Sequence, residues 1–117
     1  MAMYEGRIVL CAANSYEEKY YLNPDFGELP EDVKDELKIM CVLYVHDVGG
    51  ILTLVFDEEG QLQFEVTAEE FDPMFDDIGS RLLIKKLQTE KAGLLEALQM
   101  YFQVFFLDGA LGRGGSK

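Results

Sequence analysis

The sequence predicts an α+β fold in which an antiparallel β-hairpin, with room for a third strand, packs against three to four helices. Two apolar runs, residues 51–56 and 62–66, flank the acidic turn at residues 57–60 (DEEG), which is typical of a hairpin. Apolar residues at helical spacing occupy much of the remaining chain. Because a two-stranded ribbon is marginally stable in water, its apolar face needs those helices or a further strand.

The two strands of this hairpin differ in pattern. Residues 51–56 (ILTLVF) place apolar side chains on both faces, so we expect this strand to be covered on both sides. Residues 61–67 alternate polar and apolar side chains, which favours an edge strand with one solvent face. Gly60 can adopt the positive φ that closes the turn. The sequence therefore predicts an inner first strand and an outer second strand.

The N-terminal segment carries conflicting signals. Residues 7–12 could form a strand by their aliphatic content, but a helical spacing also runs through them, and the choice stays open. For residues 15–22 we expect a helix, with Ser15 as its N-cap and Glu18 completing a capping box. The break at Asn23-Pro24 then ends this helix.

A second helix is expected to begin at Pro30, because proline suits the first helical position and two acidic residues follow in the first turn. Its buried stripe has helical spacing and consists of Val33, Leu37, Met40 or Cys41, and Tyr44. Residues 39–45 are apolar on nearly all sides, so this helix should be the central and most enclosed one, unless its second half is extended. Gly49-Gly50 ends the element in either case.

The next helical pattern follows the hairpin and has two possible starts. Asp72 is a good N-cap and Pro73 a good first residue, so a helix can begin there. It can also begin afresh at Ser80, after Gly79. Both starts stay open.

This pattern is too long for one straight helix. Unbroken, residues 73–107 would be about 50 Å long, whereas a domain of this size has a radius of gyration of about 13 Å. The polar residues 88–91 and the following Gly93 mark a break. We therefore favour two helices, at about residues 80–88 and 90–107, over one bent helix.

The end of the last helix, residues 100–107 (MYFQVFFL), is apolar on every helical face. One small core does not easily cover so much apolar surface; a symmetric homodimer would bury the surplus, and burial within the monomer stays the alternative. The candidate interface residues are Tyr101, Phe102, Phe105 and Phe106. We assign residues 1–108 to a single α+β domain and expect the Gly-rich tail 109–117 to be disordered.

Charge is distributed unevenly along the chain. The sequence holds 22 acidic and 10 basic residues, for a formal net charge of −12, and no Lys or Arg occurs between Lys38 and Arg81. Such a surface repels phosphate backbones and anionic membranes, so we expect neither nucleic acid nor a membrane as a partner. The acidic surface either serves solubility alone or meets a basic protein partner.

Cys11 and Cys41 are the only cysteines, and each lies within an apolar run, which favours two reduced core thiols over a disulfide. Reduced thiols suit a cytoplasmic protein. No run reaches the ~20 apolar residues of a membrane span, and the N-terminal segment lacks the features of a signal peptide. We therefore expect a cytoplasmic location.

Few side chains are suited to chemistry. His46 is the only histidine, which leaves little for a catalytic triad or a histidine metal site. A Cys41–His46 dyad is conceivable, but five residues is not the spacing of a facing pair on a helix. His46 more simply favours the C-terminal end of its helix. We expect no catalytic residue and no cofactor.

An acidic cluster follows the hairpin and invites a metal-site interpretation, because hard cations prefer carboxylate oxygens. Its members are Glu69, Glu70, Asp72, Asp76 and Asp77. Their spacing matches no EF-hand loop, and helix capping explains most of them, so we expect no metal there. They remain the candidates for the alternative function, a divalent-metal-assisted hydrolase.

The chain resembles a family of small, uncharacterised bacterial proteins catalogued only as a domain of unknown function. The resemblance extends over about residues 7–107 and is carried by the strings LCAANSYEEKYYLNP, LPEDVKDELKIMCVLY, VGGILTLVFDEEG and IGSRLLIKKLQTEK. It implies a bacterial cytoplasmic setting and transfers no catalytic residue.

Together these features favour a non-enzymatic acidic interaction or regulatory module. Surplus apolar surface at the C-terminal end predicts self-association as a homodimer. The one-sided charge predicts a basic protein partner.

Overall fold

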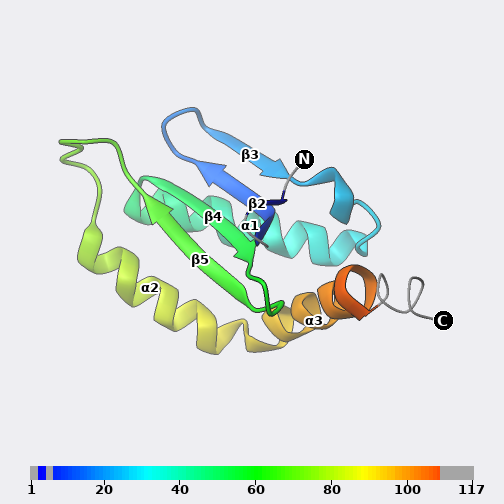
Figure 1. Cartoon of the computed structure of the whole chain (residues 1–117). Coiled ribbons are helices and arrows are strands. Elements are labelled where there is room, and N and C mark those ends of the chain that lie inside the picture. The colour runs from blue at the N-terminus through cyan, green and yellow to red at the C-terminus, as the bar shows by residue number, and fades with distance from the viewer. Residues whose placement is uncertain (1–2, 5–6, 109–117) are drawn as a thin grey trace.

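One antiparallel sheet and three α-helices make up the computed structural model, which describes residues 3–4 and 7–108 (Figure 1). The strands are β1 (Met3–Tyr4), β2 (Arg7–Asn14), β3 (Lys19–Leu22), β4 (Ile51–Phe56) and β5 (Leu62–Thr67). The helices are α1 (Glu31–Val48), α2 (Asp77–Glu90) and α3 (Ala92–Phe102), with a short 3-10 helix η1 (Pro24–Phe26) before α1 and a π-helical turn η2 (Gln103–Asp108) after α3. The α+β prediction is confirmed.

Strand β2 is at the centre of the sheet. It pairs antiparallel with β4 on one side, while β3 and the short β1 pair with different parts of its other side. The chain therefore crosses over β2 between β3 and β4, and α1 makes that crossover behind the sheet in the view of Figure 1. Helices α2 and α3 run below the sheet in the same view.

A β-bulge in β2 keeps its apolar side chains on the core face. The register shifts between Val9 and Cys11, so Ile8 lies opposite Phe56 and Cys11 lies opposite Leu54. All four of these paired residues are buried. Without the extra residue, the alternation of the strand would place one half of β2 on the wrong face.

The predicted hairpin is confirmed as β4 and β5. The Asp57 carboxylate accepts from the backbone N–H of Glu59 at 2.9 Å and of Gln61 at 3.0 Å, and Gly60 has φ 82°. β5 is the outer strand of the sheet, as its alternation predicts. The Gln99 side chain of α3 accepts from the N–H of Leu62 at 2.8 Å and so ties β5 to that helix.

The helix expected over residues 15–22 is wrong: a turn there leads into β3. The Asn14 side chain accepts from the N–H of Tyr16 at 2.8 Å, and Ser15 donates its own N–H to the carbonyl of Gly50 instead of capping a helix. Glu18 has φ 55° and turns the chain back onto β2. Pairing between strands thus overrides a local helical pattern. Of the two alternatives for residues 7–12, the strand is the one that the structure contains.

Helix α1 confirms the second predicted helix, but it is not enclosed on all sides. Its inner face is buried and includes Leu37, Met40, Cys41, Tyr44, Val45 and Val48. On its outer face Ile39 is 59% exposed and Leu43 is 56% exposed. The expected full burial of residues 39–45 is therefore wrong, because the sheet and α2 leave the outer face of α1 uncovered.

The break between the last two helices is confirmed at Lys91. The start of α2 lies between the two predicted starts: Asp76 is the N-cap, and its carboxylate accepts from the N–H of Gly79 at 2.8 Å. A helix starting at Pro73 is wrong, because Asp72 accepts from the N–H of Met74 and closes a separate turn. A helix that starts at Ser80 is also wrong, because α2 begins about one turn earlier, at Asp77.

No helix within residues 3–4 and 7–108 is long and apolar enough to cross a membrane. The Gly-rich tail expected at residues 109–117 lies outside the described residues.

Aromatic rings connect four elements at one end of the core. Phe26 of η1 stacks on Phe56 of β4 with 5.6 Å between ring centroids, and Phe56 stacks on Phe102 of α3 at 4.2 Å. Phe106 of η2 stacks on Phe26 at 4.7 Å. Such pairs stabilise a fold beyond the area that they bury, so this stack fixes η1 and α3 against the sheet.

Replacing Phe26 with Ala should lower the free energy of unfolding by about 3–5 kcal/mol, because a fully buried ring with three stacked neighbours is lost. Urea unfolding followed by circular dichroism measures this. The matched control is Phe71→Ala, whose ring is 92% exposed and which should change stability by less than about 0.5 kcal/mol. Equal effects of the two substitutions would contradict the central role of the stack.

Candidate functional site

The acidic cluster lies in the loop between β5 and α2 and at the start of α2. Glu69 and Glu70 are exposed. Asp72 accepts from the Tyr16 hydroxyl at 2.5 Å, and the Tyr16 hydroxyl in turn accepts from the N–H of Glu69 at 3.0 Å. Tyr16 therefore joins the β2–β3 turn to this loop.

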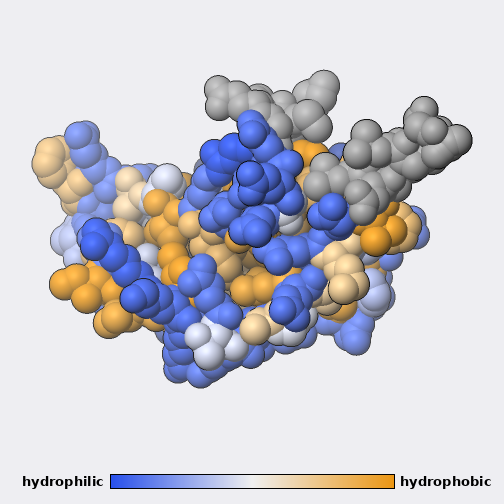
Figure 2. Space-filling model, turned by 60° about the horizontal axis from the view of Figure 1, so that its bottom comes forward, coloured by the Kyte–Doolittle hydropathy of each residue, from blue (hydrophilic) through white to orange (hydrophobic). Residues whose placement is uncertain are grey.

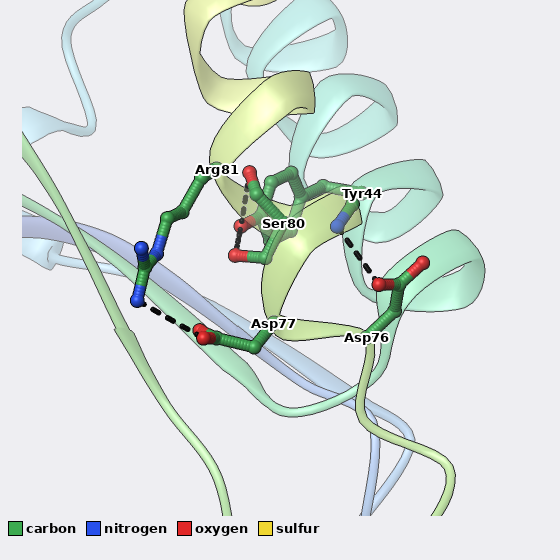
Figure 3. Close-up of polar contacts among 6 residues, drawn as sticks. Tyr44, Asp76, Asp77, Ser80 and Arg81 are labelled. Carbon is green, nitrogen blue, oxygen red and sulfur yellow. Dashed lines mark hydrogen bonds and ion pairs between the residues drawn. The ribbon is translucent and has the colours of Figure 1, made fainter.

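The two remaining acids lie at the start of α2 (Figure 3). Asp76 caps the helix, and Asp77 pairs with Arg81 at 3.0 Å, one turn further along. Beside them Tyr44 of α1 reaches the Ser80 side chain, and both of these residues are buried. This contact anchors the start of α2 to α1.

Three of these carboxylates, those of Asp72, Asp76 and Asp77, bond to neighbouring groups of the fold. Within the described part of the chain, no three His, Cys, Asp or Glu side chains are placed to share a metal ion. Hydrogen bonds explain the electrostatics of the cluster: the Tyr16 hydroxyl, followed by the N–H of Met74, lowers the pKa of Asp72 below its usual range. The same bond to Asp72 raises the pKa of Tyr16.

The two cysteines are free and buried side by side, with 3.8 Å between their sulfur atoms. The hydrogen bond to Cys11, together with burial, raises the pKa of the Cys41 thiol, and burial raises that of the nearby Tyr20 hydroxyl. A thiol with a raised pKa is a poor nucleophile at neutral pH. His46 is exposed in the last turn of α1, so it and the fully buried Cys41 form no dyad.

The predicted interface residues at the end of α3 divide into two environments. Phe102 is buried in the aromatic stack, and Tyr101 and Phe106 are half-buried beside it. Phe105 is 58% exposed, and its ring lies tilted against that of Tyr101, with 4.7 Å between the ring centroids. Met100 and Val104, near it in sequence, are also exposed.

A groove of about 490 Å³ runs between α1 and α2. Apolar side chains from both helices line it: Ile39, Met40, Leu43, Leu83 and Leu87. Charged residues also line it, and these are Asp32, Asp35, Glu36, Asp47 and Glu90 against Lys86 and Lys91. Lys91 is already paired with Glu36 at 3.1 Å, so the groove is acidic on balance.

Sequence reasoning missed this groove, because it exists only once α2 packs against α1. The available signal was the all-round apolar character of residues 39–45. In the fold, the apolar side chains of Ile39 and Leu43 are exposed along the groove. Figure 2 shows how apolar side chains gather between hydrophilic ones on one face of the molecule.

A family model described as a family of unknown function (DUF6145) matches residues 7–110, which confirms the resemblance to such a family. No curated protein and no solved structure matches the chain.

Replacing Tyr16 with Phe should raise the pKa of Asp72 toward its ordinary value, because the bond that lowers it most is removed. A carboxylate with a lowered pKa stabilises the fold above its unfolded pKa and loses that contribution as the pH falls through the folded pKa. The variant should therefore lose less stability on acidification than the parent does. Carboxyl NMR titration measures the shift.

Asp57 is the internal control for this titration. Its pKa is also lowered, but by the N–H of Gln61 first and then by neighbours that do not include Tyr16. It should titrate identically in both proteins. An Asp72 titration that Tyr16→Phe leaves unchanged would refute the assigned cause.

Proposed function

We propose that this protein, which belongs to the family of unknown function (DUF6145), is a non-enzymatic interaction module whose α1–α2 groove holds a basic amphipathic helix of a partner protein. The family description assigns no activity, so the proposal rests on the surface of the chain. The observation that carries it is the exposure of Ile39 and Leu43 beside an acidic rim.

The exposed apolar side chains of the groove favour the binding of another molecule there. Ile39 and Leu43 are one helical turn apart on α1, and each leaves more than half of its surface in water. Fully burying such a side chain is worth about 1.5–3 kcal/mol. Helix-in-groove recognition uses this arrangement, in which an amphipathic helix places apolar residues into a groove between two others.

The charges that line the groove favour a positively charged partner. Five acids line the groove against two lysines, and one of those lysines is paired with an acid of the groove. Complementary charge speeds association and disfavours acidic competitors. Along α1, the lining residues run from Asp32 to Asp47, a length of about 22 Å at 1.5 Å per residue, which suits a partner helix of four turns.

The acidic hairpin offers a smaller surface for this purpose. The Asp57 carboxylate is used within its own turn, and Glu65 pairs with Arg7. Of the acidic residues at the hairpin turn, Glu58 and Glu59 remain exposed. The groove therefore suits a basic partner better than the hairpin does.

A metal-assisted hydrolase is the weaker explanation of the acidic cluster. Asp72, Asp76 and Asp77 are each engaged by a hydrogen bond or ion pair with a neighbouring group. A cation would have to displace those partners before it could bind.

Self-association through the end of α3 is supported by a separate observation. Met100 is 68% exposed, Val104 48% and Phe105 58%, although all three follow or belong to a helix that packs on the core. Apolar side chains that lie near one another on a surface favour contact with a second copy of the chain. This surface is distinct from the residues that line the groove.

A synthetic Lys/Leu peptide of about 15 residues, which is four helical turns, with leucines along one helical face, should bind the groove. The double variant Ile39→Ser/Leu43→Ser should weaken binding at least about tenfold, because two apolar contacts worth more than 1.4 kcal/mol together are removed. Calorimetry gives the affinity, and amide shifts in NMR spectra give the location.

Two controls make this test specific. Ile78→Ser/Leu82→Ser removes two apolar residues of α2 that are even more exposed than Ile39 and Leu43 but do not line the groove, and it should leave the affinity unchanged. A peptide of the same composition without an apolar face tests for charge alone. Equal binding of both peptides, or shifts that lie outside α1 and α2, would disprove the groove as the site.

The chain should also self-associate weakly, and Phe105→Ser should shift the equilibrium toward monomer because an exposed ring at the proposed contact is removed. Analytical ultracentrifugation over a range of concentrations measures this, with Phe71→Ser as the control for an exposed ring elsewhere. A parent protein that stays monomeric at the highest concentration would end the self-association proposal.

A further inference from the structure

A second hollow lies on the other side of α1, between that helix and the β2–β3 hairpin. Its volume is about 580 Å³. Ala13, Tyr20, Val42 and Val45 give it an apolar part. It shares no lining residue with the α1–α2 groove, so what it binds is independent of the function proposed above.

The charge of this hollow is opposite to that of the chain as a whole. Lys19, Lys38 and His46 line it together with one acid, Glu18, in a chain whose net charge is −12. All three basic side chains are exposed. The excess of positive groups gives the hollow a preference for negative charge.

Among the residues that the structure describes, neither Lys19 nor Lys38 forms an ion pair, and the same holds for Lys85 and Lys86, whereas Arg7, Lys34, Arg81 and Lys91 each form one. What distinguishes Lys19 and Lys38 is that both line one hollow, where two cations can face the same external anion.

The neutral polar side chains of the hollow can also donate hydrogen bonds to a ligand. The Asn14 side-chain oxygen accepts from the N–H groups of Tyr16 and Glu17, which leaves its NH₂ group free to donate. The Ser15 hydroxyl forms no hydrogen bond within the described residues. A ligand rich in acceptor oxygens would satisfy these donors.

We propose that this hollow is a binding site for a small amphiphilic anion, whose carboxylate or phosphate group lies between Lys19 and Lys38 and whose short apolar part packs on Val42, Val45 and the Tyr20 ring. The volume lies within the range of small-molecule sites, which combine an apolar lining with a few polar groups. Glu18 opposes the anion with a single charge, and two lysines outweigh it.

The test is an NMR titration of the labelled protein with hexanoate, hexyl phosphate and hexylammonium. Both anions should shift the amides of Ser15, Lys19 and Lys38 and saturate, while hexylammonium should not. The tighter of the two anions identifies the preferred headgroup. Lys19→Gln/Lys38→Gln should weaken anion binding by about fivefold or more, because both cations that face the anionic group are removed.

Lys34→Gln/Lys85→Gln is the matched control, because it removes two lysines that line neither this hollow nor the α1–α2 groove. It should leave anion binding unchanged. Three results would each overturn the proposal: no saturable binding of either anion, equal binding of hexylammonium, or equal weakening by both lysine pairs. None of them bears on the peptide-binding groove, so the two proposals fail separately.

Discussion

The stack of Phe26, Phe56 and Phe102 is the contact on which the rest of the structure depends. It joins residues from a short 3-10 helix, an inner strand and the last α-helix, which lie far apart in sequence. Because these rings fix η1 and α3 on the same face of the sheet, the ends of α1 and α2 are fixed as well.

Helix α1 gives the protein two chemically different sides. On the α2 side, acidic side chains line the apolar groove; on the β2–β3 side, Lys19, Lys38 and His46 line an apolar hollow together with one acid. Val42 lines the second hollow, while Ile39 and Leu43, beside it in sequence, line the first. Helix α1 thus separates an acidic groove from a more basic hollow, and this asymmetry is the main support for the two binding sites that we propose.

The sequence predicts the elements that local interactions determine. The β4–β5 hairpin follows from the DEEG turn and Gly60, α1 from the acidic first turn after Pro30 and the glycines that end it, and the break at Lys91 from a polar interruption. Strand β3 could not be predicted, because the local sequence of residues 15–22 also fits a helix. Only the pairing with β2 selects the strand. Neither surface beside α1 could be predicted, since each needs residues from two elements that only the tertiary fold brings together.

The pairing of β2 with β4 has a consequence for biosynthesis. These strands form the centre of the sheet, yet all of α1 lies between them in the chain. While a ribosome is still making α1, β2 has β3 beside it but its other edge has no strand to pair with. The sheet can close only after Phe56 has left the exit tunnel, so a nascent chain shorter than this exposes an aggregation-prone edge that a chaperone would need to cover.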